Sequence, residues 1–261
     1  MKTQSVLIQD EMARSKSKLA HYCDLIIGRR GWRHLLRYEL TVWFCAMTPG
    51  ALGLFLRSKL YPRLLGSCGR NVVFGVNVTL RHPHKIHIGD NVIIDDNCLL
   101  DAKGVDNQGI RIGNGVFLGR NSILSCKNGD IVLEDRVNIG FNSEVFSGNR
   151  VVLGADTLVA AYCYFIGGDH ASADAGAAIN RQGTTARGIN IGPRCWFGAG
   201  AKILDGVAVG NDSIIGAGAV AIRDVPAYAV AVGIPARVAR DRRAGAKDAA
   251  APSPASASIP A

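Results

Sequence analysis

Several classes of protein are excluded by what this sequence lacks. Its 31 glycines among 261 residues do not recur at every third position, so the chain is not collagen-like. Its seven cysteines form no CxxC pair, and their odd number favours free thiols in a reducing cytoplasm. Residues 1–20 lack a continuous apolar core, so we expect no signal peptide. Aromatic residues make up only 7%, which together with abundant glycine indicates many tight turns.

Acidic residues are scarce in the first quarter of the chain. Residues 1–70 contain 12 lysines and arginines against 4 acidic residues, a net charge of +8, whereas residues 71–261 contain 18 against 17, a net charge of +1. Such a local excess predicts an anionic partner for the N-terminal part. A membrane surface, a phosphorylated carrier or a nucleic acid would each provide one.

A long apolar run is also missing. The uncharged run from Leu40 to Leu56 is 17 residues long, shorter than the ~20 residues of a spanning helix, and Pro49-Gly50 interrupts it. We therefore expect two short helices joined at Thr48-Pro49-Gly50. Basic residues flank the run on both sides, and two interpretations of the segment 25–66 stay open. Its apolar faces either make peripheral contact with a membrane or cap a protein core.

From about residue 72 the sequence follows a six-residue period. An aliphatic residue begins each hexad and a small or β-branched residue stands four positions later, as in Ile88 with Val92 and Ile94 with Cys98. This period fits neither a helix nor simple strand alternation. It predicts short strands separated by tight corners, where Gly, Asn and Asp tolerate positive φ. Three such strands form one triangular rung of 18 residues, so we expect a solenoid.

The rung starts predict both the size of the solenoid and an insertion. Rungs begin at positions 88, 112, 133, 153, 191 and 209, which gives about six rungs. Successive starts differ by 24, 21, 20, 38 and 18 residues, and the excess of 38 − 18 = 20 predicts a loop inserted after the fourth rung. The first and fifth positions of each hexad should face the core. Cys98, Cys163 and Cys195 occupy fifth positions, so we interpret them as small buried side chains rather than metal ligands or nucleophiles.

This pattern divides the chain into four parts. We expect a basic, apolar helical segment at 1–70, an all-β solenoid at 71–226, a closing segment at 227–243 and a disordered, low-complexity tail at 244–261. Because stacked rungs leave open ends, the helices and the closing segment should each cover one end.

The repeats and the C-terminal motif resemble the hexapeptide-repeat acyltransferases. The resemblance covers about 72–225, and Asp224-Val-Pro-Ala-Tyr-Ala-Val-Ala-Val-Gly-Ile-Pro-Ala-Arg237-Val is similar to that family's closing motif. Cys195-Trp196-Phe197-Gly198 matches an aromatic-bearing rung beside the active site, and the likeness is strongest to sugar and polysaccharide O-acetyltransferases. The resemblance implies a left-handed parallel β-helix with short N-terminal helices, assembled as a homotrimer. We expect this trimer in the cytoplasm, either free or at the inner face of the membrane. It also implies acetyl-CoA as co-substrate, bound between neighbouring β-helices, and a sugar or glycan acceptor.

The same resemblance gives His170 the place of the family's catalytic histidine, where the 20-residue loop begins. The chemistry agrees with this role, because a hydroxyl that attacks a thioester needs a base and an imidazole titrates near neutral pH. We interpret His170 as the general base of a direct transfer without a covalent enzyme intermediate. A backbone N–H in the region 196–199 is expected to stabilise the oxyanion.

Other candidates accompany the proposed base. Asn142 resembles an acceptor-binding residue of sugar acetyltransferases and is equally well explained as a corner asparagine. Asp169 orients the histidine, contacts a sugar hydroxyl or is a solvated loop acid. Trp196 packs on the acceptor, on pantetheine or on the core. Arg181 and Arg187, in the loop, are candidates for contact with an anionic acceptor.

Acyl-CoA needs a close-fitting surface for pantetheine and cations for its phosphates. For the nucleotide phosphates the candidates are Arg237 and Arg240, with a solvated basic tail as the alternative. For pantetheine we expect the small residues Gly198, Ala199, Ala201, Ala217 and Gly218 to let the ligand lie against the backbone.

Other functions of this fold fit less well. His82, His84 and His87 form a cluster, but carbonic anhydrases of this fold use histidines spread over different rungs, so we expect no metal. A nucleotidyltransferase would need a nucleotide-binding domain, and 1–70 is too short for one and contains no GxGxxG or P-loop. A non-enzymatic scaffold and an N-acetyltransferase of an amino sugar stay open. The basic N-terminal segment suits a membrane or phosphate better than nucleic acid, which is not expected as a partner.

Overall fold

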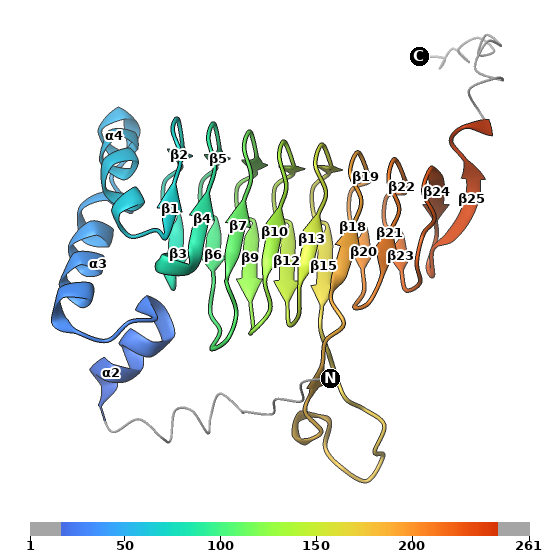
Figure 1. Ribbon diagram of the computed structural model, residues 1–261, viewed down its shortest axis with the longest axis horizontal. Helices are drawn as coiled ribbons and strands as arrows, with labels where there is room; N and C mark the ends of the chain where they lie inside the picture. The colour runs from blue at the N-terminus through green and yellow to red at the C-terminus, as the bar shows by residue number, and fades with distance from the viewer. Residues whose placement is uncertain (1–16, 245–261) are drawn as a thin grey trace, which may run out of the picture.

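The computed structural model describes residues 17–244 and shows a parallel β-solenoid with three sheets along its length (Figure 1). Sheet A contains β1 (Ser67–Cys68), β4 (Ile86–Ile88), β7 (Ile110–Ile112), β10 (Ile131–Leu133), β13 (Val151–Leu153), β18 (Ile189–Ile191) and β21 (Ala208–Val209). Sheet B contains β2 (Val73–Phe74), β5 (Ile93–Ile94), β8 (Phe117–Leu118), β11 (Asn138–Ile139), β14 (Leu158–Val159), β19 (Trp196–Phe197), β22 (Ile214–Ile215), β24 (Ala229–Val232) and β25 (Arg237–Asp241). Sheet C contains β3 (Thr79–Arg81), β6 (Leu99–Asp101), β9 (Ile123–Cys126), β12 (Glu144–Ser147), β15 (Tyr164–Gly167), β20 (Lys202–Ile203) and β23 (Val220–Ala221).

Each turn of the solenoid adds one strand to every sheet. Register partners along sheet A lie 20, 24, 21, 20, 38 and 18 residues apart, which confirms the predicted intervals and the solenoid. The solenoid has about eight turns rather than six, because β1 to β3 form a turn before Ile88 and β24 begins a last one. The first turn has a weak signal in the sequence, since the half-buried Cys68 stands where Ile88 and Ile112 stand in the next two turns. The inserted loop therefore follows the fifth turn, not the fourth.

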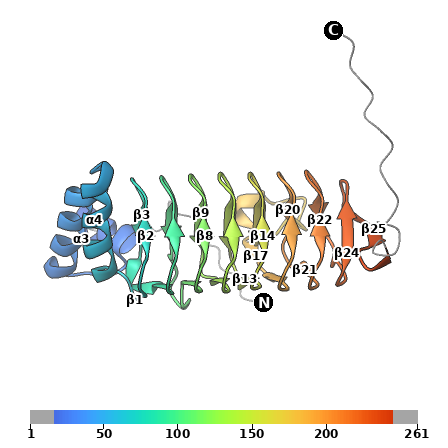
Figure 2. The ribbon, with the colours of Figure 1, turned by 90° about the horizontal axis from the view of Figure 1, so that it is seen from above.

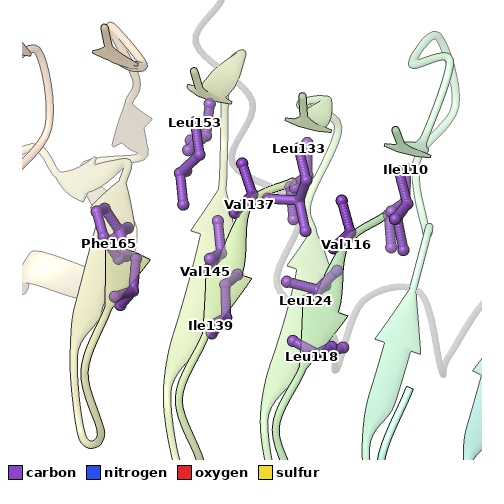
Figure 3. Packing of buried hydrophobic residues seen from close by; sticks show 14 of the residues in the cluster. Ile110, Val116, Leu118, Leu124, Leu133, Val137, Ile139, Val145, Leu153 and Phe165 are labelled. Atoms are coloured by element: carbon purple, nitrogen blue, oxygen red, sulfur yellow. The ribbon is translucent and has the colours of Figure 1, made fainter. Parts of the chain in front are cut away.

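The core is a stack of inward side chains, one from almost every strand (Figure 3). Ile94, Leu118 and Ile139 are register partners on neighbouring strands of sheet B, and all three are buried. Burial of one such side chain contributes roughly 1.5–3 kcal/mol. Each turn buries its apolar residues against the turns before and after it, which explains why the period is so regular along the chain.

The cysteines at fifth positions lie in this core, as predicted. Cys98, Cys163 and Cys195 are each at most 1% exposed, and the Sγ of Cys98 lies 3.2 Å from the carbonyl oxygen of Gly119. Burial raises the pKa of the Cys98 thiol to about 12, and it also raises the pKa of the Cys163 and Cys195 thiols. A thiol held neutral in this way is a poor nucleophile.

Helices cover the N-terminal end of the solenoid (Figure 2). They are α2 (Lys18–Tyr22), a π-helical turn η1 (Cys23–Ile27), α3 (Trp32–Cys45), α4 (Gly50–Leu60) and the 3-10 turn η2 (Tyr61–Arg63), while a further 3-10 turn η3 (Pro83–Lys85) precedes β4. The two helices expected on either side of Thr48-Pro49-Gly50 are thus α3 and α4. They pack against each other, and α4 packs on β2.

A buried arginine joins these helices to the solenoid. Arg57 of α4 is 2% exposed, and its Nε donates to the carbonyl oxygen of Phe74 on β2 at 2.9 Å. Its Nη1 donates to the carbonyl oxygens of Cys45 and Thr48 at 2.9 and 2.8 Å. The last carbonyls of a helix have no partner within the helix, so Arg57 supplies the donors that the end of α3 lacks.

Helix α3 has two opposite faces. Tyr38, Thr41 and Cys45, spaced by three and four residues, are buried against the protein. The other face carries a stripe of exposed apolar side chains, formed by Trp32, Leu36, Leu40 and Trp43 and continued by Met47. Within residues 17–244, none of the helices has the length and apolar character that crossing a membrane requires.

The C-terminal end is formed by a hairpin. β24 extends sheet B in parallel with β22, and β25 pairs antiparallel with β24 and forms the edge of the sheet. Arg237 and Arg240 lie on β25 and are exposed. The tail expected at 244–261 falls, except for Ala244, outside the described residues.

Candidate functional site

The inserted loop leaves sheet C at the end of β15 and projects from the solenoid (Figure 1). Its neck is a two-stranded antiparallel hairpin, in which β16 (Asp169–His170) pairs with β17 (Thr184–Thr185). A 3-10 turn, η4 (Ile179–Arg181), lies near the far end of the loop. The neck holds His170 beside the body of the solenoid, opposite Thr184.

The imidazole of His170 is exposed. It makes no hydrogen bond to any residue between 17 and 244, so both ring nitrogens are available to a ligand. The Oδ1 of Asp169 accepts the backbone N–H of His170 at 2.7 Å. Asp169 therefore fixes the backbone of the histidine in this structure rather than the orientation of its ring.

The return of the loop is clamped by a buried carboxylate. Asp205 is 8% exposed and accepts the backbone N–H groups of Arg187 and Gly188 at 2.8–2.9 Å. The guanidinium of Arg187 lies 3.6 Å from the same carboxylate. Gly188 has φ +88, and a Cβ there would lie 2.2 Å from the carbonyl oxygen of Arg150, so the position requires glycine. Asn149, in the preceding turn, also holds the returning end of the loop, because its Nδ2 donates to the carbonyl oxygen of Ala186 at 3.1 Å.

We expect Asp205→Asn to loosen the loop and to slow turnover about tenfold, because an amide N–H₂ would face backbone donors and cost about 1–3 kcal/mol. Asp130→Asn is the matched control, since Asp130 accepts the N–H groups of Gln108 and Gly109 in the same way at another loop. Hydrogen exchange of 168–188 and steady-state rates check the expectation. Equal rates for the two variants would contradict it.

The residues predicted for CoA gather at a different place. Gly198 and Ala199 lie at the corner between sheets B and C, and Gly218 of the next turn donates its N–H to the carbonyl oxygen of Ala199 at 2.8 Å. Ala217 is exposed at the same corner. Ala201 is 1% exposed, with its side chain in the core, so only its backbone faces this corner.

Asn142 shares this corner two turns earlier. Its φ is +53, and its N–H donates to the carbonyl oxygen of Arg120 at 3.0 Å. Strands of sheet C separate this corner from the base of the loop, and four residues of strand span about 13 Å. Within one chain, therefore, the structure groups Asn142 with the predicted CoA residues and places His170 beyond the other end of sheet C.

Trp196 faces outward from sheet B, and its neighbour Phe197 fills the core. This excludes core packing as the role of the indole ring. The ring belongs to a row of outward register partners, made up of Val73, Ile93, Phe117, Asn138, Leu158, Trp196, Ile214 and Val230. All but Asn138 are apolar, so one face of sheet B presents a nearly continuous apolar stripe to solvent.

A groove of about 500 Å³ runs beneath the returning end of the loop. Arg150 and Arg187 line it together with Glu134 and Asn190. Of the two loop arginines, Arg187 thus faces a cavity, and Arg181 is exposed on η4. An anionic group in the groove would meet two guanidinium groups.

Two aromatic side chains beside the CoA candidates were not predicted from the sequence. Phe141 and Tyr162 are exposed at the corner of sheets B and C, with ring centroids 5.5 Å apart and edge-to-face geometry. The guanidinium of Arg120 lies 5.2 Å from the Phe141 ring. Nearby on sheet C, burial raises the pKa of the Glu144 carboxyl, and burial and Glu144 together raise the pKa of Tyr164. The sequence signal for Phe141 and Tyr162 was a large residue at a corner position that Gly, Asn or Asp usually occupies.

Two histidines of the cluster His82, His84 and His87 have hydrogen-bond partners within the protein. His82 contacts the backbone carbonyl of Asp24 through Nε2 at 2.9 Å, and His87 Nδ1 lies 2.9 Å from Ser67 Oγ. Residues 17–244 contain no group of three or more His, Cys, Asp or Glu side chains arranged to hold a metal ion.

Comparisons with known proteins match both ends of the solenoid. Residues 67–102 match the hexapeptide repeat of succinyl-transferase, and residues 188–222 match the bacterial transferase hexapeptide (six repeats). Both family models describe hexapeptide repeats of transferases, and the two matches support the resemblance to the hexapeptide-repeat acyltransferases. A probable acetyltransferase of Mycobacterium tuberculosis is 29% identical over 51% of this hexapeptide-repeat chain and 45% of its own length. A putative acetyltransferase of Staphylococcus aureus is 33% identical over 41% of this chain and 62% of its own.

The fold of this hexapeptide-repeat chain also occurs in a solved enzyme. A variant of AntD, an N-acyltransferase from Bacillus cereus in complex with dTDP-4-amino-4,6-dideoxyglucose and coenzyme A, superposes with a TM-score of 0.54. The match covers 79% of this chain and 95% of AntD at 14% identity, which shows a shared fold alone. The chain spans about half of the length of the curated relatives named above.

Proposed function

We propose that this protein transfers an acetyl group from acetyl-CoA to a hydroxyl of a sugar or glycan, with His170 as the general base. The observation that carries the proposal is the exposed imidazole of His170, held at the neck of a clamped loop with both ring nitrogens available. The names of the relatives, which are acetyltransferases, support the reaction class.

The reaction follows from these groups. The acceptor oxygen attacks the thioester carbonyl carbon while His170 takes the hydroxyl proton. The carbonyl oxygen becomes an oxyanion, which a backbone N–H donor would stabilise. The C–S bond then breaks, the carbonyl re-forms, and the imidazolium returns its proton to the CoA thiolate. No metal enters any of these steps.

We further infer that the complete site lies between two copies of the chain in a homotrimer. Within one chain the predicted CoA corner and His170 lie at opposite ends of sheet C, so a neighbour's corner must face the loop. The apolar stripe of sheet B is the surface suited to this contact, because water-exposed apolar rows of this size mark interfaces. Seven free cysteines favour a reducing compartment, and we propose that the enzyme acts in the cytoplasm.

Leu158→Asp should break this assembly, because it buries a charge in an apolar contact. We expect a monomer with little activity. Val105→Asp, which alters a 77% exposed residue outside sheet B, is the matched control. Light scattering after gel filtration measures the mass, and an unchanged trimer or an active monomer would contradict the inference.

Thiol release from acetyl-CoA with a panel of acceptors tests the function itself. The panel pairs sugars, nucleotide sugars and glycan fragments with amino sugars, so that O-acetyl and N-acetyl products are distinguished. Acceptor-dependent release supports the proposal, and product analysis names the group. An N-acetyl product alone would replace the hydroxyl acceptor by an amine, and the absence of both CoA binding and release would favour a scaffold.

A further inference from the structure

A second cavity, of about 360 Å³, lies between the N-terminal helices and the first two turns of the solenoid. Ile27, Tyr38, Leu64, Leu65 and Pro83 form its apolar part. Its polar part contains cationic or titratable basic side chains from four elements and the loop before α3: Arg29, His34, Arg37, Arg63, His84 and His87. No aspartate or glutamate lines this cavity.

The three arginines of the cavity have no protein partner. Among residues 17–244, the guanidinium groups of Arg29, Arg37 and Arg63 form no ion pair within 4 Å and no hydrogen bond. Seven other arginines of the described residues form ion pairs, as Arg30 does with Asp24 and Arg136 with Asp156. All three arginines are exposed, and an anion bound in the cavity would offset the repulsion among their like charges.

The histidine side of the cavity is closely fitted. The Nδ1 atom of His84 is buried and has no hydrogen-bond partner among the described residues. A Cβ at Gly28 would lie 2.8 Å from Cε1 of His84, and a Cβ at Gly66 would lie 2.6 Å from Cε1 of His87. Only glycine at these two positions leaves the rings where they are. The cavity thus combines unpaired donors with a shape that a larger side chain would alter.

We propose that this cavity, which we call the cationic cavity, binds a phosphate group. Guanidinium groups match phosphate oxygens in geometry and charge, and three of them with adjacent imidazoles suit a phosphomonoester, a phosphodiester or a pyrophosphate. The inference does not depend on the acetyl transfer, because the cavity borders the first two turns and the loop with His170 follows the fifth.

An apolar surface on the same helix makes a membrane lipid one source of the phosphate to test. Arg37 of the cavity and the apolar stripe of Trp32, Leu36, Leu40 and Trp43 belong to the same helix, α3. Aromatic and apolar side chains beside cations are typical of segments that lie in the headgroup region of an anionic membrane. Tyr38, which lines the cavity, belongs to the face of α3 opposite this stripe, so the vesicle measurement below decides whether one lipid engages both features.

The assignment has a consequence for the protonation of His84. Burial and the nearby Arg29 lower the pKa of His84 to about 4, so its ring is neutral when the cavity holds no anion. His82 and Lys85 on one side, and His34, Arg37, Arg63 and His87 around the cavity, add further positive or titratable groups. A bound phosphate would raise the pKa of His84, so the bound state favours the protonated ring more than the empty cavity does.

The test compares two double variants of the full chain that lose the same charge. Arg37→Gln/Arg63→Gln alters the cationic cavity, and Arg33→Gln/Lys59→Gln removes two exposed cations of α3 and α4 outside it. Inorganic pyrophosphate is titrated calorimetrically into each protein at 0.15 M salt, where long-range charge effects are screened. Flotation with phosphatidylcholine vesicles, with and without phosphatidylglycerol, measures lipid binding.

We expect pyrophosphate to bind the wild type and the control variant, and to bind the cavity variant at least tenfold more weakly. A matching selective loss of binding to phosphatidylglycerol vesicles identifies a lipid headgroup as the source. Selective loss of pyrophosphate binding with unchanged vesicle binding identifies a soluble phosphate compound. Equal losses in the two variants, or no binding of either probe by the wild type, would overturn the proposal.

Discussion

His170→Ala is expected to reduce the rate of acetyl transfer by about 10²–10⁴-fold, the usual contribution of a positioned general base. The imidazole is exposed and makes no hydrogen bond to residues 17–244, so its removal should leave the fold and the binding of CoA intact. The measurement is thiol release at saturating acetyl-CoA, with the acceptor that the panel identifies. The loss should appear in kcat, because the base acts on the transferred proton rather than on binding.

Two controls make this result specific. His21→Ala removes a histidine of the N-terminal helices and should leave the rate unchanged. Added imidazole should restore part of the rate to His170→Ala, because a free base can enter the space that the side chain leaves. Near-normal turnover by His170→Ala would show that another group takes the proton. The half-buried Glu144 would then be the first residue to substitute.

The solenoid was predictable because one physical requirement recurs in every turn. Each corner needs a residue that tolerates positive φ, and Asn97, Asn121 and Gly200 meet it at the places where the hexads put them. Most inward positions hold aliphatic or small side chains, with Phe74, Phe165 and Phe197 as the aromatic ones, and this restriction makes the period visible without a structure. The first turn was not counted as a rung, because Cys68 stands where an aliphatic residue ends the first strand of the next two turns.

The site was less predictable, because contacts made far apart along the chain decide it. The clamp by Asp205 on Gly188 joins two different turns, and neither residue differs in type from ordinary corner residues. The separation of His170 from Asn142 follows from the length of sheet C, which hexad counting does not measure. The cationic cavity arises where helices meet the solenoid, and residues as distant as Arg29 and His87 line it.

Arg57→Met should destabilise the N-terminal helices by about 2–4 kcal/mol, because a methionine of similar length fills the space and donates no hydrogen bond. The carbonyl oxygens of Phe74, Cys45 and Thr48 would lose the donors that the guanidinium provides. Relief from burying a charge offsets part of this cost, which is why the expected value lies below the sum of three hydrogen bonds to a charged group.

Lys59→Met is the matched control, since it removes the same charge from the same helix at an exposed position. Hydrogen exchange should become faster in 32–66 of Arg57→Met and stay slow in the central turns, because a solenoid transmits instability only to neighbouring turns. The freed edge of the first turn would expose unpaired strands, so the variant should also aggregate at a lower temperature. If both variants unfold alike, the helices are held by apolar packing alone, and the three hydrogen bonds of Arg57 contribute no net stability.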